Sequence, residues 1–307
     1  MKKFGLAAVT TLALASASYL ALAGSSYAAD MMLKSPAMEA AQPVSGYIEL
    51  YSGWGNTTIK GDEGYRFGLD GWTLGGAARG TYWWSHNASL QLDVQGEGTS
   101  FSDGSQGRFS EHSFLIGGHA SWRDSRYLWG VFGAAGDATT FSGPNFRHGV
   151  VGGEGQAYLG AVTLYGQIGY DTTVGSPLFG PVNGINAVFG RGTVRYYLAP
   201  NTRLEGTGLY AGGKVDLCCG IAEENFHIWL ARAKIEHKFA GSPFSVFAAY
   251  EWSETHFDGS RLENQKMTAG VRLGINEGTL QSNDRKGTTL DIIDVLRLVG
   301  GGISPSP

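Results

Sequence analysis

The sequence lacks several features that mark common protein classes. No uninterrupted apolar run reaches the length of about 20 residues that a transmembrane helix needs. Charged residues make up only 16% of the chain, against about 25% in a typical soluble domain. The net charge of −4 offers no basic surface for nucleic acid. If the chain enters a membrane, it must therefore do so as β-strands.

Motifs for cofactors and metals are also missing. The two cysteines, Cys218 and Cys219, are adjacent and have no histidine nearby, which fits neither a disulfide framework nor a zinc site. The seven histidines show no metal-ligand spacing. Segment 206–211 has the glycine spacing of a dinucleotide fingerprint, but no helix pattern follows it. We therefore predict no cofactor, no metal and no catalytic residue.

The first residues have the pattern of an export signal. Two lysines precede an apolar stretch over 4–22, and segment 26–28 places small residues where a signal peptidase cleaves. We predict a signal peptide over 1–28, removed after Ala28. No cysteine stands at this point, which argues against a lipoprotein anchor. Residues 29–44, rich in Ala, Met and Pro, are predicted to form a flexible periplasmic leader.

Strict alternation of apolar and polar side chains indicates β-strands. Between Ala88 and Thr99, one parity carries Leu90, Leu92 and Val94, while the other is polar. A strand sends successive side chains to opposite faces, so this segment has one apolar wall and one polar wall. In a soluble sandwich the apolar wall would face a second sheet, whereas in an exported chain it can face lipid.

Similar segments recur along the chain, most of them about 9 to 14 residues long, which is enough to cross a bilayer when tilted. They are predicted at 46–54, 71–84, 88–99, 112–122, 127–136, 149–159, 162–171, 187–198, 202–212, 225–239, 244–253 and 266–275. Short links alternate with long polar links near 55–70, 100–111, 137–148, 172–186, 213–224 and 254–265. This alternation is typical of outer-membrane barrels. The predicted fold class is all-β: a transmembrane antiparallel up-and-down β-barrel of about 12 strands over 45–275, with short periplasmic turns and long extracellular loops.

Aromatic residues gather beside the predicted turns and loops. Those near the short turns are Tyr82, Trp83, Trp84, Trp122, Tyr127, Trp129, Tyr196 and Tyr197. Those near the long loops are Trp54, Trp72, Tyr250 and Trp252. Such rings accumulate at headgroup depth, so they predict two aromatic girdles, the alternative being aromatics of a soluble core.

Three segments carry a family resemblance. They are the start over 29–36, the Gly-aromatic first strand over 46–55 and the final strand over 268–275. On these segments the chain resembles the alphaproteobacterial outer-membrane porin-like and OmpA-like β-barrel proteins. The resemblance implies residence in the outer membrane and recognition of the last strand by the barrel assembly machinery. Such barrels usually end on an aromatic residue, whereas this chain continues to Pro307.

Residues 276–307 are predicted to form a C-terminal periplasmic tail. Leu290, Ile293, Leu296 and Val299 recur every three residues, which favours a short amphipathic helix. The tail could dock under the barrel or stay disordered. It is too short for a peptidoglycan-binding domain.

The polar parity of the strands predicts the residues that line the lumen. The predicted acidic residues are Glu49, Asp93, Glu97 and Glu154, with Asp171 on the same parity. The predicted basic residues are Arg79, Arg191, Arg195, Arg203, Arg232, Lys234 and Arg272, with Lys266 on the same parity. Acidic residues fall mainly on early strands and basic ones on later strands. They could set up a transverse field across a pore, or pair across a filled barrel.

The last long link carries residue types found in hydrolases: Ser253, Glu254, His256, Asp258 and Ser260. A polar surface loop contains these types by default, and no strand-fixed Ser and His pair projects from the lipid face. A lipid hydrolase is therefore the least favoured function, and we predict that the protein is not an enzyme.

The predicted function is passive diffusion of small polar solutes or ions through a narrow charged lumen in the outer membrane. The alternative is a non-conducting structural or surface-interaction barrel. The predicted partners are outer-membrane lipid and the barrel assembly machinery, with no nucleic acid. Assembly into a homo-oligomer is left open.

Overall fold

The computed structural model describes residues 43–61, 65–102, 108–139, 145–174, 182–217, 223–257 and 259–300. The predicted signal peptide and nearly all of the predicted leader lie outside these residues. Cys218, Cys219 and Asp258 lie outside them as well.

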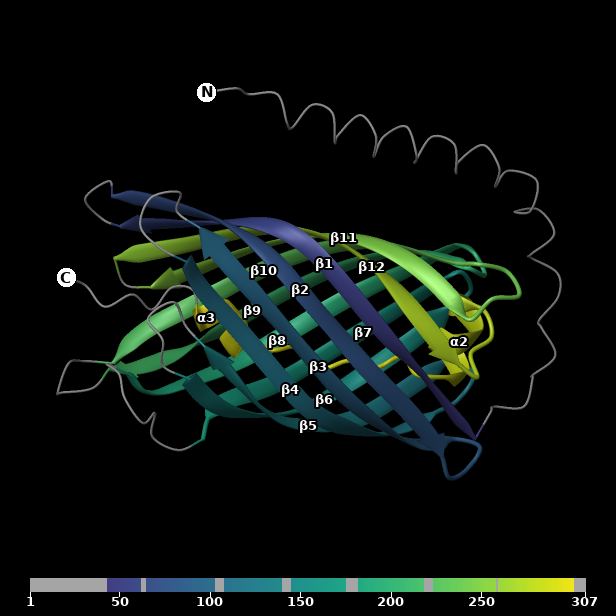
Figure 1. The fold of residues 1–307 in the computed structure, drawn as a ribbon. Coiled ribbons are helices and arrows are strands. Elements are labelled where there is room, and N and C mark those ends of the chain that lie inside the picture. The colour runs from purple at the N-terminus through teal and green to yellow at the C-terminus, as the bar shows by residue number, and fades with distance from the viewer. Residues whose placement is uncertain are drawn as a thin grey trace, which may run out of the picture. The chain divides into compact units, whose positions relative to one another are not determined.

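The described residues form twelve antiparallel strands that close into one barrel (Figure 1). The strands are β1 (Val44–Gly61), β2 (Arg66–Trp83), β3 (Ala88–Ser102), β4 (Arg108–Arg123), β5 (Tyr127–Thr139), β6 (Asn145–Leu159), β7 (Val162–Thr173), β8 (Val182–Ala199), β9 (Thr202–Leu217), β10 (Glu224–Lys238), β11 (Phe244–Phe257) and β12 (Ser260–Ile275). Each strand pairs with its neighbours in sequence, and β1 pairs with β12 from Gly46↔Ile275 onward. The predicted fold class and strand number are confirmed.

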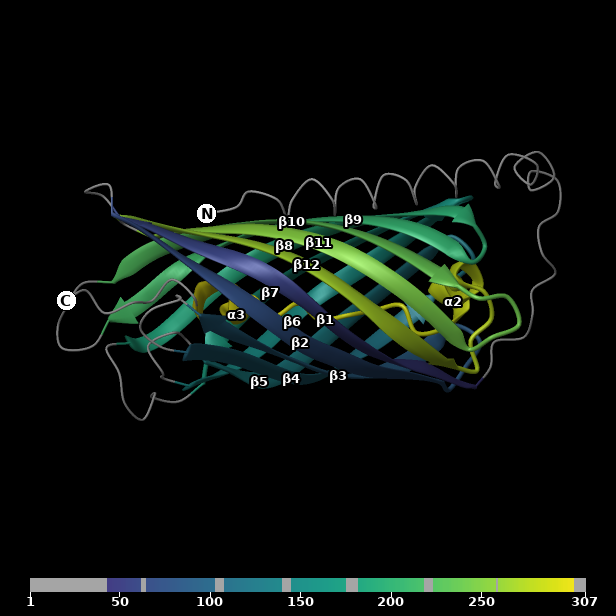
Figure 2. The same cartoon turned by 45° about the horizontal axis from the view of Figure 1, so that its top comes forward.

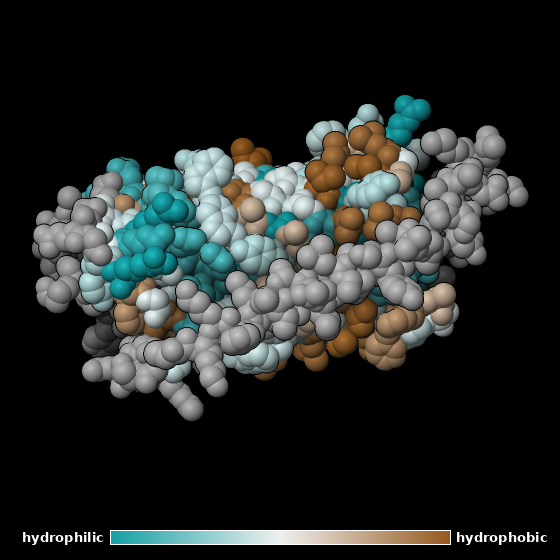
Figure 3. Space-filling model, turned by 90° about the horizontal axis from the view of Figure 1, so that it is seen from above, coloured by the Kyte–Doolittle hydropathy of each residue, from teal (hydrophilic) through white to brown (hydrophobic). Residues whose placement is uncertain are grey.

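Side chains alternate between the two faces of the barrel wall. On β3, Leu92 is 70% exposed on the outer face, whereas its neighbours Gln91 and Asp93 are 3% and 2% exposed inside. Apolar side chains are likewise exposed on other strands, among them Leu50, Ile116, Val131, Ile168, Val188 and Val271. Figure 3 shows apolar residues mostly on the half of the barrel near the short turns, and hydrophilic residues toward the other end. The outer face therefore carries an apolar region.

The predicted girdle residues divide between the two faces. Tyr82, Trp84, Trp129 and Tyr196 are exposed, as are the other predicted girdle residues except three. Trp83 and Tyr197 are buried, and Trp252 is half-buried. The prediction was wrong for Trp83 and Tyr197, because consecutive strand residues point to opposite faces and only one parity reaches the outer surface.

All strands except β10 are longer than predicted, and their lengths run from 12 residues in β7 to 18 in β1. β1 and β2 extend through most of the predicted loop at 55–70. Asn56 donates to Asp70 over 2.8 Å, and Lys60 pairs with Glu263 over 2.8 Å across the extended strands. These strand ends carry polar residues on both faces, so the alternation of apolar and polar residues does not reveal them. Main-chain pairing continues there without an apolar face.

The chain after β12 turns into the barrel. Helix α2 (Leu280–Lys286) lies at the short-turn end, and helix α3 (Leu296–Gly300) lies toward the opposite end (Figures 1 and 2). We call residues 276–299 the lumen segment. The structure thus places within the barrel a segment that was predicted on the periplasmic side. None of the helices among the described residues is long and apolar enough to cross a membrane.

The helix predicted from the apolar spacing near 290–299 forms only at its end, as α3. Leu290 packs with Leu128, Tyr158 and Tyr165, whereas Ile292 and Val295 join a second cluster. A chain enclosed by a barrel can bury side chains on every side. Its apolar spacing therefore does not require a helix with one apolar face.

Closure of the barrel requires a glycine on β1. A Cβ at Gly53 would lie 2.0 Å from the carbonyl oxygen of Met267 and 2.7 Å from Cγ2 of Thr268. We expect Gly53→Ala to destabilise the barrel by about 1–3 kcal/mol, because the β1–β12 pair must shift. Gly208→Ala is the matched control, since a Cβ there meets nothing within 4 Å. Guanidinium unfolding in detergent micelles measures both, and equal stabilities would contradict the prediction.

Candidate functional site: the barrel lumen

Polar side chains of the wall hold the backbone of the lumen segment. The side-chain amides of Gln91 and Gln95 donate to the carbonyl oxygens of Leu290 and Ile292, over 2.7 and 3.0 Å. Gln167 donates to the carbonyl oxygen of Asp291 over 2.7 Å. An extended chain inside a barrel leaves its carbonyl groups without ladder partners, and buried carbonyl groups need a donor. Wall side chains supply these donors.

Two arginines of β8 bind carboxylates of the lumen segment. Arg191 makes a two-pronged contact with Asp291 at 2.7 and 2.8 Å. Arg195 donates to Asp284 over 2.6 Å and also contacts Glu205 at 3.1 Å. Paired hydrogen bonds between a guanidinium and a carboxylate are among the stronger polar contacts in proteins. The basic part of the wall thus neutralises acidic residues of the segment.

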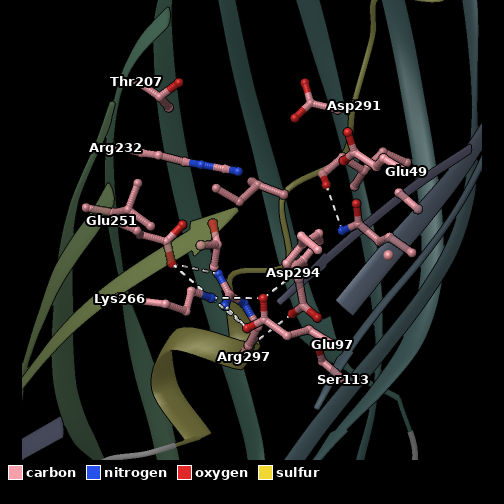
Figure 4. A pocket seen from close by; sticks show the side chains of 18 of the residues that line it. Glu49, Glu97, Ser113, Thr207, Arg232, Glu251, Lys266, Asp291, Asp294 and Arg297 are labelled. Atoms are coloured by element: carbon pink, nitrogen blue, oxygen red, sulfur yellow. Dashed lines mark hydrogen bonds and ion pairs between the residues drawn. The ribbon is translucent and has the colours of Figure 1, made fainter. Parts of the chain in front are cut away.

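The acidic part of the wall binds the basic end of the segment. Arg297 contacts Glu97 on β3 at 2.5 Å and Glu251 on β11 at 3.2 Å. Lys266 on β12 lies 2.7 Å from Glu97. Figure 4 shows these four side chains meeting around the end of the lumen segment. Arg297 therefore connects two sides of the barrel.

An apolar region of the inner wall also receives the segment. Ile292, Val295, Leu296 and Val299 are almost fully buried. They belong to one cluster with inward side chains of β4, β5, β6, β8, β9 and β10, including Leu115, Phe132, Val150, Phe189, Leu209 and Ile228. Burial of such side chains contributes about 1.5–3 kcal/mol each. Apolar residues of the segment thus meet apolar residues of the inner wall, and charged residues of the segment meet charged residues of the wall.

A cavity of about 130 Å³ remains beside the segment. Its lining includes Glu49, Glu97, Arg232, Glu251 and Asp291 (Figure 4). Arg232 extends into this space without an ion pair to any described residue. Two neighbouring cavities measure about 60 and 40 Å³.

All the predicted lumen residues lie on the inner face, and most have a charged partner. Asp93 lies 3.3 Å from both Arg79 and His119, and Glu154 lies 2.7 Å from His119. Further pairs include Lys234–Glu49 at 3.7 Å, Arg203–Glu236 at 2.8 Å and Arg272–Glu236 at 3.3 Å. Of the two interpretations of these charges, the geometry fits pairing within a filled barrel.

Sequence reasoning missed the contribution of the tail. Asp284, Asp291 and Arg297 were left outside the lumen, and His119 and His148 were not assigned to it. The order of charges in the tail could have indicated its place in the lumen. Its acidic residues complement the basic part of the wall, and its residue Arg297 complements the acidic part. No sequence pattern indicated the burial of His119 and His148, since each has both apolar and polar neighbours in the sequence.

Of the hydrolase residue types, His256 contacts Glu254, but Ser253 does not join them. Ser253 is buried on the inner face, whereas His256 is partly exposed and stacks on His227 at 4.6 Å between ring centroids. Ser253 and His256 thus point to opposite faces of β11 and form no nucleophile–base pair.

No family model matches the chain, and no curated protein matches it. Among solved structures, it is similar to the COG4313 outer membrane channel from Pseudomonas putida F1, with a TM-score of 0.56 and 11% identity over 79% of this chain and 100% of that chain. The fold is that of an outer-membrane β-barrel. The translocator domain of autotransporter NalP from Neisseria meningitidis matches at a TM-score of 0.46 and 11% identity, covering 86% of this chain and 98% of that chain. The narrower resemblance to alphaproteobacterial porin-like proteins stays a prediction.

We expect loss of the buried Arg195–Asp284 ion pair to destabilise the barrel more than loss of the exposed Lys214–Glu223 pair. Both side chains are nearly inaccessible, at 6% and 0% exposure, so Asp284→Asn leaves a buried guanidinium short of charge. We expect a loss of about 3 kcal/mol in the free energy of unfolding. Lys214→Gln breaks an exposed pair with Glu223 and should cost less than about 1 kcal/mol. Denaturant titration of the two variants measures the difference, and equal costs would contradict the prediction.

Proposed function

We propose that the protein is an outer-membrane channel for small polar solutes or ions, and that the lumen segment closes it. The barrel wall is complete without this segment, because all its strands pair with one another. The segment adds no strand to the ladder and is held mainly by side chains, with one main-chain bond from the Gln281 N–H to the carbonyl oxygen of Pro200 in a short turn. It can therefore leave the lumen without breaking the wall's main-chain hydrogen bonds.

The observation that carries the proposal is the charge match between the wall and the segment. Withdrawal of residues 280–299 would expose Arg191 and Arg195 on one side and Glu97 and Glu251 on the other. Twelve strands enclose a space between that of filled eight-stranded barrels and that of open sixteen-stranded porins. A passage lined by opposite charges suits polar solutes, since charged linings set ion preference.

The apolar outer face supports the proposed location in the outer membrane. Side chains such as Leu50, Leu92 and Ile168 are more than half exposed, which a lipid environment would stabilise. Lipid contact and insertion by the barrel assembly machinery are parts of this proposal.

A second candidate function is a non-conducting structural barrel, and the filled lumen favours it. The cavity of about 130 Å³ beside the segment has room for only a few water molecules. The two candidates differ in whether the lumen segment can move.

Removal of the segment tests the proposal. We expect a chain that ends at Ile275 to give discrete conductance steps in a planar bilayer, whereas the full chain is closed for most of the recording. A full-length variant carrying Asp284→Asn, Asp291→Asn and Arg297→Gln should show intermediate opening, because it loses three charged contacts of the segment. This variant keeps the test valid if the shortened chain does not fold.

Heat-modifiable migration on SDS gels serves as the folding control for each variant. A folded shortened chain that stays silent would overturn the channel proposal and favour the non-conducting barrel.

Arg232 predicts the ion preference of the opened barrel. It extends into the cavity, so in the shortened chain Arg232→Glu should raise the cation-to-anion permeability ratio. Lys214→Glu makes the same charge change at an exposed position outside the lumen and is the control. Reversal potentials in a salt gradient measure the ratio, and an equal shift in both variants would show that Arg232 does not line the path.

A further inference from the structure

Three buried side chains from distant parts of the sequence meet where the lumen segment touches the wall. They are His148 on β6, Asp171 on β7 and Asp294 in the segment. Their exposures are 1%, 0% and 5%. One potential ligand atom from each lies within 4.8 Å of the others. This is a convergence of metal-ligating residue types that sequence spacing could not show.

The hydrogen bonding of this cluster is incomplete. His148 Nδ1 lies 2.8 Å from Asp171 Oδ1, which fixes the orientation of the imidazole ring. His148 Nε2 is buried and has no hydrogen-bond partner in the described part of the chain, whereas the Asp171 carboxylate is also stabilised by the backbone N–H of Leu296. Buried polar atoms are normally satisfied, so the unpartnered nitrogen of His148 needs an explanation.

The spacing of the unsatisfied nitrogen fits a shared cation. His148 Nε2 lies 3.7 Å from Asp294 Oδ1, which is too far for a hydrogen bond. Two ligands bound at about 2.1 Å to a tetrahedral Zn²⁺ lie ~3.4 Å apart. A small movement of the lumen segment would therefore bring both atoms to bonding distance of one ion.

We propose that His148 Nε2 and Asp294 bind a divalent transition-metal ion of the Zn²⁺ type, which fastens the lumen segment to the barrel wall, while Asp171 orients the imidazole ring from its Nδ1 side. An imidazole nitrogen with carboxylate oxygens is a donor set that such ions accept, whereas Ca²⁺ and Mg²⁺ prefer oxygen alone. Two carboxylates also balance the charge of the ion in a buried place.

The site fixes a particular point of the segment. Asp294 Oδ1 also accepts a hydrogen bond from the backbone N–H of Arg297 over 3.0 Å, next to the start of α3. A bound ion would hold this turn, and with it the contacts of Arg297 to Glu97 and Glu251. Metal binding itself does not depend on the proposed conduction.

His119 provides an internal control. It is another buried histidine of the lumen with two carboxylate neighbours, but both its ring nitrogens have partners, Glu154 at 2.7 Å and Asp93 at 3.3 Å. It therefore presents no free ligand atom.

Zn²⁺ titration of the full chain tests the proposal. The protein in detergent micelles is stripped with a chelator and titrated with ZnCl₂ by calorimetry. All samples carry His256→Gln, because the stacked His227 and His256 on the outer face could bind Zn²⁺ themselves. We expect one Zn²⁺ per chain, an affinity at least about tenfold lower in His148→Gln and Asp294→Asn, and an unchanged affinity in His119→Gln.

Asp294→Asn carries the test if His148→Gln fails to fold, because its residue is not in the wall and asparagine keeps the acceptor for the Arg297 N–H. Absence of Zn²⁺ binding by the full chain would overturn the proposal, as would an equal loss of affinity in His119→Gln. Because no conductance is measured, these outcomes are independent of whether the protein is a channel.

Discussion

The main-chain pairing of β1 with β12 is the constraint on which the rest of the structure depends. It closes the sheet, so each strand has a neighbour on both sides, and it fixes one parity of every strand outward and the other inward. Apolar side chains such as Leu92 then face out, and charged ones such as Asp93 face in. Closure thereby creates an interior whose charges must find partners.

The lumen segment supplies partners for charged residues of the interior. Arg191 pairs with Asp291 of the segment and with no carboxylate of the described wall. Arg195 and Glu97 have wall partners in Glu205 and Lys266, and the segment adds Asp284 and Arg297 to them. Its apolar residues cover the apolar part of the inner wall. These contacts involve mainly side chains and no strand pairing, which is the basis of the proposal that the segment can leave the lumen. The same dependence underlies the proposed channel and the proposed metal site.

Strand patterns were predictable because each depends on neighbours in sequence. The two-residue period of Leu90, Leu92 and Val94 was enough to predict that they share one face of a strand. Trp83 and Tyr197 are aromatic but lie on the inward parity, so residue type alone does not predict which aromatic residues face outward. The tail was misplaced because its apolar spacing resembles that of an amphipathic helix. Its real environment is the inner surface of twelve strands, and no local pattern within the tail records that enclosure.

The sequence by itself determined the β-class, the strand number and the residues of the inner face, because strand geometry converts alternation into two faces. Only the tertiary structure decided what fills the lumen and which charges pair. Arg195 and Asp284, or His148 and Asp294, lie far apart in the chain and meet only after closure. The physical reason is that periodicity acts over a few residues, whereas buried charge and apolar surface are satisfied wherever the closed barrel brings a partner.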